Sequence, residues 1–187
     1  MNIAIFASGQ GTNAENILNH FKDSSICVKV IVTNNPLAGV IDIAKNYDIP
    51  LLIIDKNIFN NRIKFLELLA DFNLDLIVLA GFLWLIPAFL INKYKNQIIN
   101  IHPALLPRYG GKGMYGMKVH RSVKESGDKS TGITIHYVNE HYDEGNIIFQ
   151  ANVKIIKSDT PEQIATKVHE LEYKYFPLVI QDLLKEK

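Results

Sequence analysis

The sequence predicts an α/β fold with a mainly parallel sheet and helices on both of its faces. Apolar runs of strand length alternate with helical stretches along the chain, which is typical of right-handed crossovers between parallel strands. The run "DLIVLAGF" (75–82) is continuously apolar after its first residue and suits a central strand buried on both sides. The last two expected strands are joined by "NEHYDEGN" without a helix between them. We therefore expect a Rossmann-like sheet that ends in an antiparallel hairpin near the C-terminus.

The expected elements follow from the apolar runs and the segments between them, in chain order. We expect strands at Ile3–Ala7, Cys27–Thr33, Leu51–Ile54, Leu76–Ala80, Ile98–Ile101, Gly132–Val138 and Ile147–Ile155. We expect helices at Ala14–Phe21, Leu37–Asn46, Arg62–Phe72, Pro87–Tyr94 and Val119–Ser126, and a long one from Pro161 to the C-terminus. Thr160 is the expected N-cap of that long helix, because proline and an acidic residue follow it. Pro177 is expected to kink or interrupt the helix near Tyr175.

Length and composition are those of one globular domain spanning residues 1–187. The chain is 48% hydrophobic and 21% charged and has a formal net charge of +1, so bulk electrostatic binding to nucleic acid or to a membrane surface is not expected. A single cysteine, Cys27, excludes an internal disulfide and a multi-cysteine metal site. The start "MNIAIFASG" has no basic segment and is interpreted as a first strand rather than a signal peptide. These features predict a reduced, cytoplasmic protein.

The stretch "IINIHPALLP" (98–107) carries an amide and an imidazole two places apart in an apolar strand. Side chains at positions i and i+2 of a strand share one face, so Asn100 and His102 project side by side. Pro103 keeps His102 extended and ends the strand ladder. Two interpretations stay open from these residues alone. The pair faces a cleft and carries chemistry, or it is a buried pair that only satisfies neighbouring backbone groups.

The turn "SGQGTN" directly follows the first strand and precedes a helix. Gly9 and Gly11 allow a tight turn, and Thr12 and Asn13 add side-chain donors near the positive end of the helix, which is a credible phosphate site. A side chain at Gly11 is expected to block the approach of the phosphate to the backbone. The alternatives are a purely structural turn and a dinucleotide site. The second is disfavoured because the next strand ends in "VTNNP", without the acidic residue that binds a ribose hydroxyl.

A third candidate is Asp143 in the loop "NEHYDEGN", as an anionic partner of His102. A carboxylate beside an imidazole raises its pKa, so we expect His102 to be charged more often near neutral pH. Glu140 and Glu144 compete for this role, and a simple turn aspartate is the alternative. His136 is interpreted as a hydrogen-bonded strand residue rather than a catalyst. The histidines lack metal-ligand spacing and no serine or cysteine nucleophile motif occurs, so no metal and no covalent mechanism are expected.

Together, "SGQGTN", "VLAGF", "NIHPALLP" and "HYVNEHYDEG" resemble the phosphoribosylglycinamide formyltransferases, folate-dependent enzymes of purine biosynthesis. The similarity runs from Met1 to about Leu184 and implies a single formyltransferase domain over residues 1–187. The implied reaction moves the formyl group of 10-formyltetrahydrofolate, a co-substrate, to the amine of glycinamide ribonucleotide. In the implied mechanism Asn100 and a protonated His102 stabilise the oxyanion of a tetrahedral intermediate. Asp143 then keeps His102 charged and oriented.

The resemblance also implies where the two substrates bind. The ribonucleotide phosphate is expected on Gly11, Thr12 and Asn13, and its ribose near Glu172. The folate is expected along two segments and at two further residues: Leu83, Trp84, Leu85 and Ile86, then Tyr137, Val138 and Asn139, with Arg62 and Asn100. Many relatives carry an arginine where this chain has Trp84. The loop "RYGGKGMYGMKVH" (108–120) is longer than the common version, and its four glycines suggest a flap.

Other functions remain as alternatives. A formyltetrahydrofolate deformylase uses the same three catalytic residues with water as acceptor, but such proteins usually carry an N-terminal regulatory domain. A methionyl-tRNA formyltransferase needs a further C-terminal domain. A non-catalytic nucleotide-binding module would not need Asn100, His102 and Asp143 together, and a dinucleotide oxidoreductase is the weakest alternative. The expected partners are the two small-molecule substrates, without nucleic acid or membrane, and the expected state is a monomer or homodimer.

Overall fold

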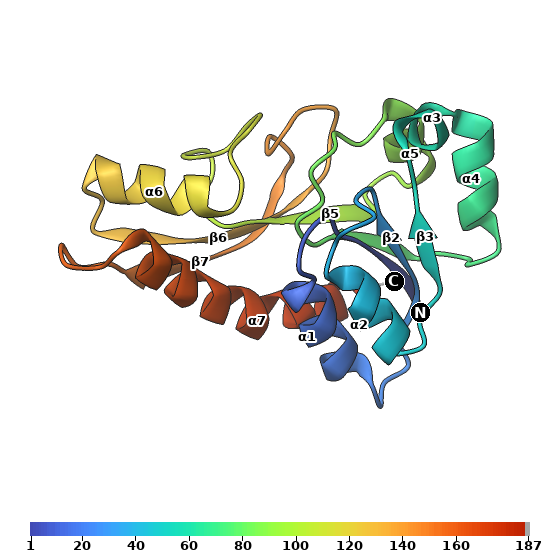
Figure 1. Cartoon of the computed structure of the whole chain (residues 1–187), viewed down its shortest axis with the longest axis horizontal. Coiled ribbons are helices and arrows are strands. Elements are labelled where there is room, and N and C mark those ends of the chain that lie inside the picture. Colours follow the sequence, from blue (N-terminus) through green and yellow to red (C-terminus); the bar gives the residue numbers. More distant parts are fainter. Residues whose placement is uncertain (186–187) are drawn as a thin grey trace.

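The computed structural model describes residues 1–185, which form a seven-stranded mixed sheet in the order β3-β2-β1-β4-β5-β6-β7 (Figure 1). The strands are β1 Asn2–Phe6, β2 Cys27–Thr33, β3 Leu51–Ile53, β4 Leu76–Leu79, β5 Ile98–His102, β6 Ser130–Tyr137 and β7 Ile147–Lys154. The first five strands pair in parallel, while β6 runs antiparallel to both β5 and β7. The predicted fold class, including the antiparallel pair at the C-terminal end, is confirmed.

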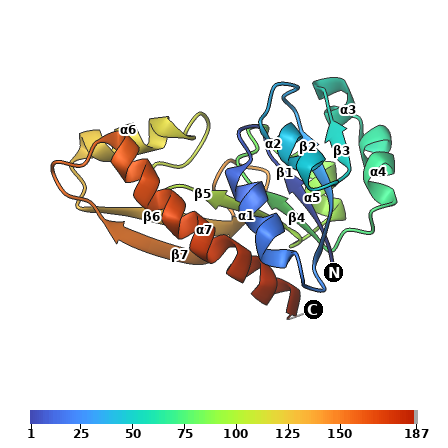
Figure 2. The ribbon, with the colours of Figure 1, turned by 60° about the horizontal axis from the view of Figure 1, so that its bottom comes forward.

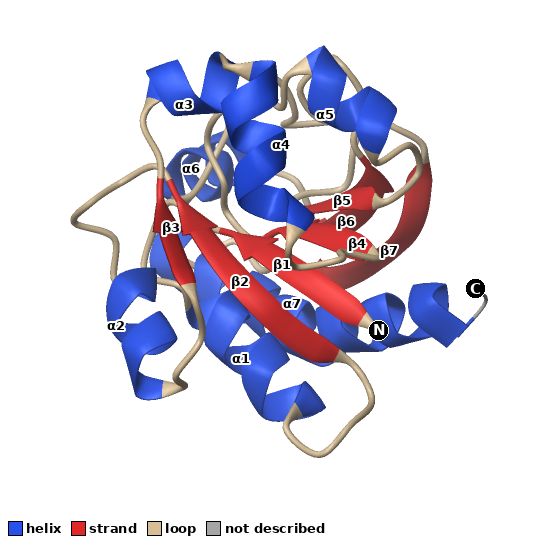
Figure 3. Cartoon of the chain, turned by 90° about the vertical axis from the view of Figure 1, so that its right-hand side faces the viewer, coloured by secondary structure: helices blue, strands red, loops and turns tan. Residues whose placement is uncertain are grey.

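Helices cover both faces of this sheet (Figure 3). They are α1 Thr12–Phe21, α2 Val40–Asn46, α3 Lys56–Asn60, α4 Arg62–Ala70, α5 Ala88–Lys93, α6 Met117–Ser126 and α7 Pro161–Lys185. Buried side chains of α1, α2, α6 and α7 pack in one hydrophobic core, and those of α3, α4 and α5 in a second. Successive side chains of β1 point to opposite faces of the sheet, so the strand contributes to both cores. Ile3 and Ile5 pack in the first core, and Ala4 and Phe6 pack in the second.

Apart from shifts of one to three residues at element ends, such as α2 beginning at Val40 rather than Leu37, the structure differs from the sequence prediction in two elements. The short helix α3 was not expected, although Asp55 caps it by accepting a hydrogen bond from the Ile58 amide at 2.7 Å. Pro177 lies inside α7 and does not interrupt it, since the helix continues to Lys185. Buried Phe176 and Ile180 flank the proline, so packing holds the helix where its local sequence favours a break. No described helix is both long enough and apolar enough to cross a bilayer.

Helix α7 packs against both the C-terminal strands β6 and β7 and the N-terminal helix α1. It begins with the expected cap, in which the Gln163 amide donates to the Thr160 hydroxyl and the Gln163 side chain accepts from the Thr160 amide. From there α7 crosses β6 and β7 and reaches α1 (Figure 2). The carboxyl ends of the parallel strands β1, β4 and β5 meet at one edge of the sheet, where α/β proteins bind their ligands. This edge holds the candidate site.

Candidate active site

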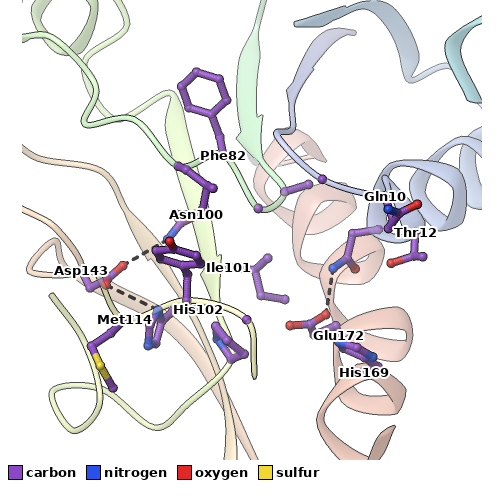
Figure 4. Close-up of a pocket in the computed structure, with 18 of the residues that line it drawn as sticks. Gln10, Thr12, Phe82, Asn100, Ile101, His102, Met114, Asp143, His169 and Glu172 are labelled. Atoms are coloured by element: carbon purple, nitrogen blue, oxygen red, sulfur yellow. Dashed lines mark hydrogen bonds and ion pairs between the residues drawn. The ribbon is translucent and has the colours of Figure 1, made fainter. Parts of the chain in front are cut away.

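A cavity of about 470 Å³ lies at the carboxyl ends of β1, β4 and β5. Its walls come from segments far apart in the chain: the turn after β1, the loop after β4, the end of β5, the loop before α6, the turn after β6, and α7. Figure 4 shows Asn100, His102 and Asp143 on one side and Thr12, His169 and Glu172 on the other. The three predicted catalytic residues and the predicted ribonucleotide residues therefore face one common space.

Asn100 and His102 lie two positions apart on β5 and both line the cavity, as the strand alternation predicted. Asp143 joins them from the turn after β6. Its Oδ2 lies 3.4 Å from His102 Nδ1, and its Oδ1 accepts from Asn100 Nδ2 at 3.4 Å. The competing carboxylates Glu140 and Glu144 are exposed. Of the three acidic residues in this loop, Asp143 is the partner of His102.

The contacts of His102 indicate which ring nitrogen carries its proton. Nε2 lies 2.7 Å from the main-chain carbonyl oxygen of Tyr109. A carbonyl oxygen only accepts, so Nε2 carries a proton and donates it to Tyr109. Nδ1 lies 3.4 Å from Asp143 Oδ2 and carries no proton when the ring is uncharged.

Asp143 raises the pKa of His102 as expected, but burial outweighs this effect. The side chain of His102 is almost completely buried, and this desolvation lowers its pKa below 6.5. The Asp143 carboxylate and the bond to Tyr109 both act in the opposite direction but do not compensate. The expectation of a raised pKa was therefore wrong for the free protein. Burial also opposes ionisation of Asp143, but contacts with His136, His102 and the Gly111 amide outweigh it and hold the pKa of Asp143 below its usual value.

His136 makes a contact with Asn100 that the sequence did not reveal. It pairs with Asn100 across β5 and β6, and its Nδ1 donates to the carbonyl oxygen of Tyr137 at 2.8 Å. With its proton on Nδ1, Nε2 accepts from Asn100 Nδ2 at 3.1 Å. His136 thereby fixes the orientation of the Asn100 amide. Only the pairing register of two distant strands could have indicated this contact.

The opposite wall is built from the turn after β1 and from α7. Gly11 precedes α1 with a φ of 82°, and Thr12 and Asn13 begin the helix at the cavity wall. Asn13 Nδ2 donates to Glu172 Oε2 at 2.8 Å, and burial of Glu172 raises the pKa of its carboxyl group. The other side-chain atom of Asn13, Oδ1, is buried and has no hydrogen-bond partner within residues 1–185. This wall joins a helix N-terminus, which favours an anion, to a carboxyl group that can bind hydroxyls.

Two further histidines line the cavity and were not expected there. His120 on α6 is buried, and its ring meets that of His169 on α7 edge to face, with centroids 6.2 Å apart. Burial, together with the charges of His169 and His102, lowers the pKa of His120 to about 4. At neutral pH His120 is therefore an uncharged group in the wall. The sequence did not indicate this position, because a histidine on the buried face of a helix is usually an ordinary core residue.

The residues expected to bind folate are only partly brought together. Leu83 and Asn100 line the cavity, whereas Leu85 is exposed and Ile86 is buried in the core. Trp84 is half-buried against Phe59 and Phe82, and the remaining expected residues, Tyr137, Val138 and Asn139, are half-buried at the end of β6.

Arg62 lies elsewhere. It begins α4, whose buried face packs in the second core, and it lines a separate groove with Lys93 between α4 and α5. The structure therefore does not place Arg62 at the cavity.

The sequence matches the formyl transferase family model over residues 1–180. It is 39% identical over 192 residues to the chloroplastic phosphoribosylglycinamide formyltransferase of Arabidopsis thaliana, a match covering 99% of this chain and 66% of the relative. It is 37% identical over 187 residues to phosphoribosylglycinamide formyltransferase of Bacillus subtilis, covering 97% and 93%. The chain thus spans just under two thirds of the plant relative's length.

Solved structures agree with this similarity. The crystal structure of phosphoribosylglycinamide formyltransferase from Bacillus halodurans superposes with a TM-score of 0.88 at 35% identity, covering 98% of this chain and 95% of that one. At this identity and coverage the similarity extends to the sequence as well as to the arrangement of the strands and helices.

Proposed function

Because this chain belongs to the formyl transferase family, we propose that it transfers the formyl group of 10-formyltetrahydrofolate to the amine of glycinamide ribonucleotide. The product is N-formylglycinamide ribonucleotide, an intermediate of purine biosynthesis. One observation carries this proposal. The Asn100, His102 and Asp143 group and the turn that suits a phosphate face the same cavity from opposite walls. A hydrolase that uses water as its acceptor does not need the wall formed by the turn after β1 and by Glu172.

The reaction makes one bond and breaks one. The amine nitrogen of the ribonucleotide bonds to the formyl carbon, and the formyl oxygen becomes an oxyanion. When this tetrahedral intermediate collapses, the bond between the formyl carbon and N10 of the folate breaks. The proton that the amine loses ends on N10. The protein has to stabilise the oxyanion and carry that proton.

Asn100 is suited to stabilise the oxyanion. His136 holds its amide nitrogen, and the second amide hydrogen makes only a long bond of 3.4 Å to Asp143. The oxyanion of the intermediate is more basic than the Asp143 carboxylate, so it accepts more strongly and can replace this long contact. The donor is already oriented and needs no rearrangement when the charge develops, which is the condition for a large effect on rate.

His102 is suited to move the proton. It is buried, which lowers its pKa below the usual value and favours the uncharged ring near neutral pH, and its Nδ1 lies 3.4 Å from Asp143 Oδ2. A developing negative charge nearby favours the imidazolium, so His102 takes up a proton as the intermediate forms and releases it as N10 departs. The Asp143 carboxylate stabilises the transient positive charge.

The two substrates are proposed to bind at different walls of the cavity. We place the phosphate at the start of α1, on Gly11, Thr12 and Asn13, and the ribose hydroxyls at Glu172. The folate enters beside Leu83 and Asn100. Cytoplasmic location, a monomeric or dimeric state and one formyltransferase domain over residues 1–187 stay predictions from the sequence.

The decisive experiment is to measure loss of the formyl group from 10-formyltetrahydrofolate with glycinamide ribonucleotide present and omitted. We expect turnover only when the ribonucleotide is present, with one N-formyl product formed for each formyl group lost. His102→Asn serves as the inactive control for spontaneous deformylation. Equal rates with and without the ribonucleotide would replace this proposal by a deformylase.

A further inference from the structure

Two main-chain groups of the loop before α6 hold the catalytic pair His102 and Asp143. The carbonyl oxygen of Tyr109 accepts from His102 Nε2 at 2.7 Å, and the amide of Gly111 donates to Asp143 Oδ2 at 2.9 Å. The two groups lie two residues apart on one short segment. A displacement of this segment therefore moves both contacts together.

The segment is packed against the site and adopts a strained conformation. Tyr109 has a φ of 59°, in the left-handed region that costs a residue with a side chain free energy. At Gly110 a Cβ atom would lie 2.5 Å from Leu106 Cδ2 and 3.2 Å from Asp143 Cβ. The main chain therefore lies directly against Asp143, and something outside the site must hold Tyr109 in its conformation.

A polar cluster on the outer side of the loop supplies this anchor. The Tyr109 hydroxyl donates to Asp128 Oδ2 at 2.7 Å and lies 2.6 Å from Ser126 Oγ. Asp128 is held in turn by Arg108, whose two terminal nitrogens lie 2.9 and 3.0 Å from its two carboxylate oxygens. The guanidinium also donates to the Tyr109 hydroxyl at 3.0 Å.

This cluster has the geometry of an effective anchor. An isolated ion pair on a surface contributes little, but a bidentate arginine–carboxylate pair that shares hydrogen bonds with a third group holds a fixed shape. Ser126 and Asp128 belong to the end of α6 and the turn that follows it, so the phenol links the loop to a regular element. None of these four side chains lines the cavity.

We propose that Tyr109 is a positioning residue whose phenol, tied to Asp128 and Ser126, holds the carbonyl oxygen that keeps the proton of His102 on Nε2. With Nε2 occupied in this way, Nδ1 is left for Asp143 and for the reactants. The tautomer of the catalytic histidine is thus set by a phenol outside the cavity. The effect of Tyr109 on turnover rests on the proposed formyl transfer, whereas its contacts with Asp128 and Ser126 do not.

The test is to measure the ring nitrogens of His102 by NMR on protein labelled with ¹⁵N-histidine, with His102→Asn identifying its signals. In the wild type we expect neutral His102 to carry its proton on Nε2. Tyr109→Phe keeps the ring and removes the hydroxyl, and we expect it to shift both nitrogen signals toward a mixture of the two tautomers. Asp128→Asn, which keeps the side-chain shape, is a second variant and should change the signals in the same direction.

Tyr47→Phe is the matched control, because it removes a phenol that bonds to Asn19 Oδ1 at 2.8 Å outside the cavity. It should leave both signals unchanged. In the formyl transfer assay Tyr109→Phe should lower kcat by about 10- to 100-fold while both KM values stay within about twofold, since a catalytic group is misplaced and no substrate contact is lost.

Two results overturn the proposal. Folded Tyr109→Phe and Asp128→Asn proteins with the wild-type signals of His102 would show that the phenol does not hold the tautomer. Changed signals with unchanged kcat would remove the positioning role. The NMR result stands whether or not the wild type transfers a formyl group, so failure of the proposed function is recognised separately.

Discussion

At the scale of single residues, the side chains proposed for catalysis, Asn100, His102 and Asp143, form a connected set of contacts. Asp143 faces His102 with Oδ2 and accepts from Asn100 with Oδ1. The Gly111 amide donates to the same Oδ2, and the Tyr109 carbonyl oxygen accepts from His102 Nε2. A group of this kind works as a unit, because removing one member leaves the others without the partner that orients them. Its members should therefore not contribute independently to the rate.

We expect His102→Asn to lower kcat by about 10²–10³-fold, the usual cost of losing one group that stabilises an oxyanion. Asp143→Asn should reproduce much of this loss, because without its negative charge the pKa of His102 falls further and the imidazolium is harder to form. The double variant should lose little more than His102→Asn alone. The measurement is kcat at saturating substrates, with folding checked by thermal melting.

Glu144→Gln is the matched control for Asp143→Asn, since it neutralises the exposed carboxylate next along the chain. It should keep wild-type turnover. If the losses of His102→Asn and Asp143→Asn multiply in the double variant, the two residues act independently and the unit described above does not exist.

At the scale of elements, the turn between β1 and α1 depends on Gly11 for a reason that the sequence did not predict. A side chain there was expected to meet the phosphate. Instead, a Cβ atom would lie 2.8 Å from Val40 Cα and from Ile43 Cδ1, on α2. Gly11 also has a φ of 82°, which only glycine adopts without strain. The glycine therefore serves the packing of the turn against α2, and the turn presents Thr12 and Asn13 as a consequence.

Gly11→Ala should lower the free energy of unfolding by about 2 to 4 kcal/mol, the sum of left-handed strain and overpacking against α2. Gly9→Ala is the control in the same turn, because no atom lies within 4 Å of a Cβ built there. It should change the stability by less than about 0.5 kcal/mol. Urea unfolding measures both. Equal losses would show that the turn is sensitive to any side chain and that packing on α2 is not the cause.

At the scale of the whole molecule, local patterns predicted what depends on local chemistry. Alternation along β5 placed Asn100 and His102 on one face, and the residues around Thr160 predicted the start of α7. The family resemblance also predicted residues of both walls of the cavity. It included Asn13 and Glu172, which are 159 residues apart in the sequence but hydrogen-bonded in the structure.

The rest depended on distances between segments that no short pattern contains. The role of His136 needs the register of β5 with β6, and the anchor of Tyr109 needs the end of α6. The pKa of His102 was predicted in the wrong direction because burial is a property of the folded core, whereas the partner Asp143 could be inferred from a turn. The position of Arg62 followed from the packing of α4, which the sequence left open.

Burial of histidine also contributes to the change of the stability of the fold with pH. His120 has a pKa of about 4 in the folded protein, lowered from 6.5 by burial and by the charges of His169 and His102. Between these values His120 binds more protons in the unfolded chain than in the folded one, so its contribution lowers the free energy of unfolding as the pH falls from 6.5 to 4. His102 acts in the same direction because its pKa is also lowered, and Glu172 acts in the opposite direction because its pKa is raised.

The loss due to His120 amounts to about 3 kcal/mol, from a change of 1.36 kcal/mol for each pH unit between about 4 and 6.5. His120→Gln has no imidazole to protonate, so its stability should fall less over this range than that of the wild type, even if the variant is less stable at pH 7. Urea unfolding at several pH values between 4 and 7 gives the slope for each protein. His141→Gln, an exposed position in the turn after β6, should keep the wild-type slope. If His120→Gln keeps that slope as well, the acid sensitivity of the fold originates elsewhere, and the contact of α6 with α7 through His120 does not control it.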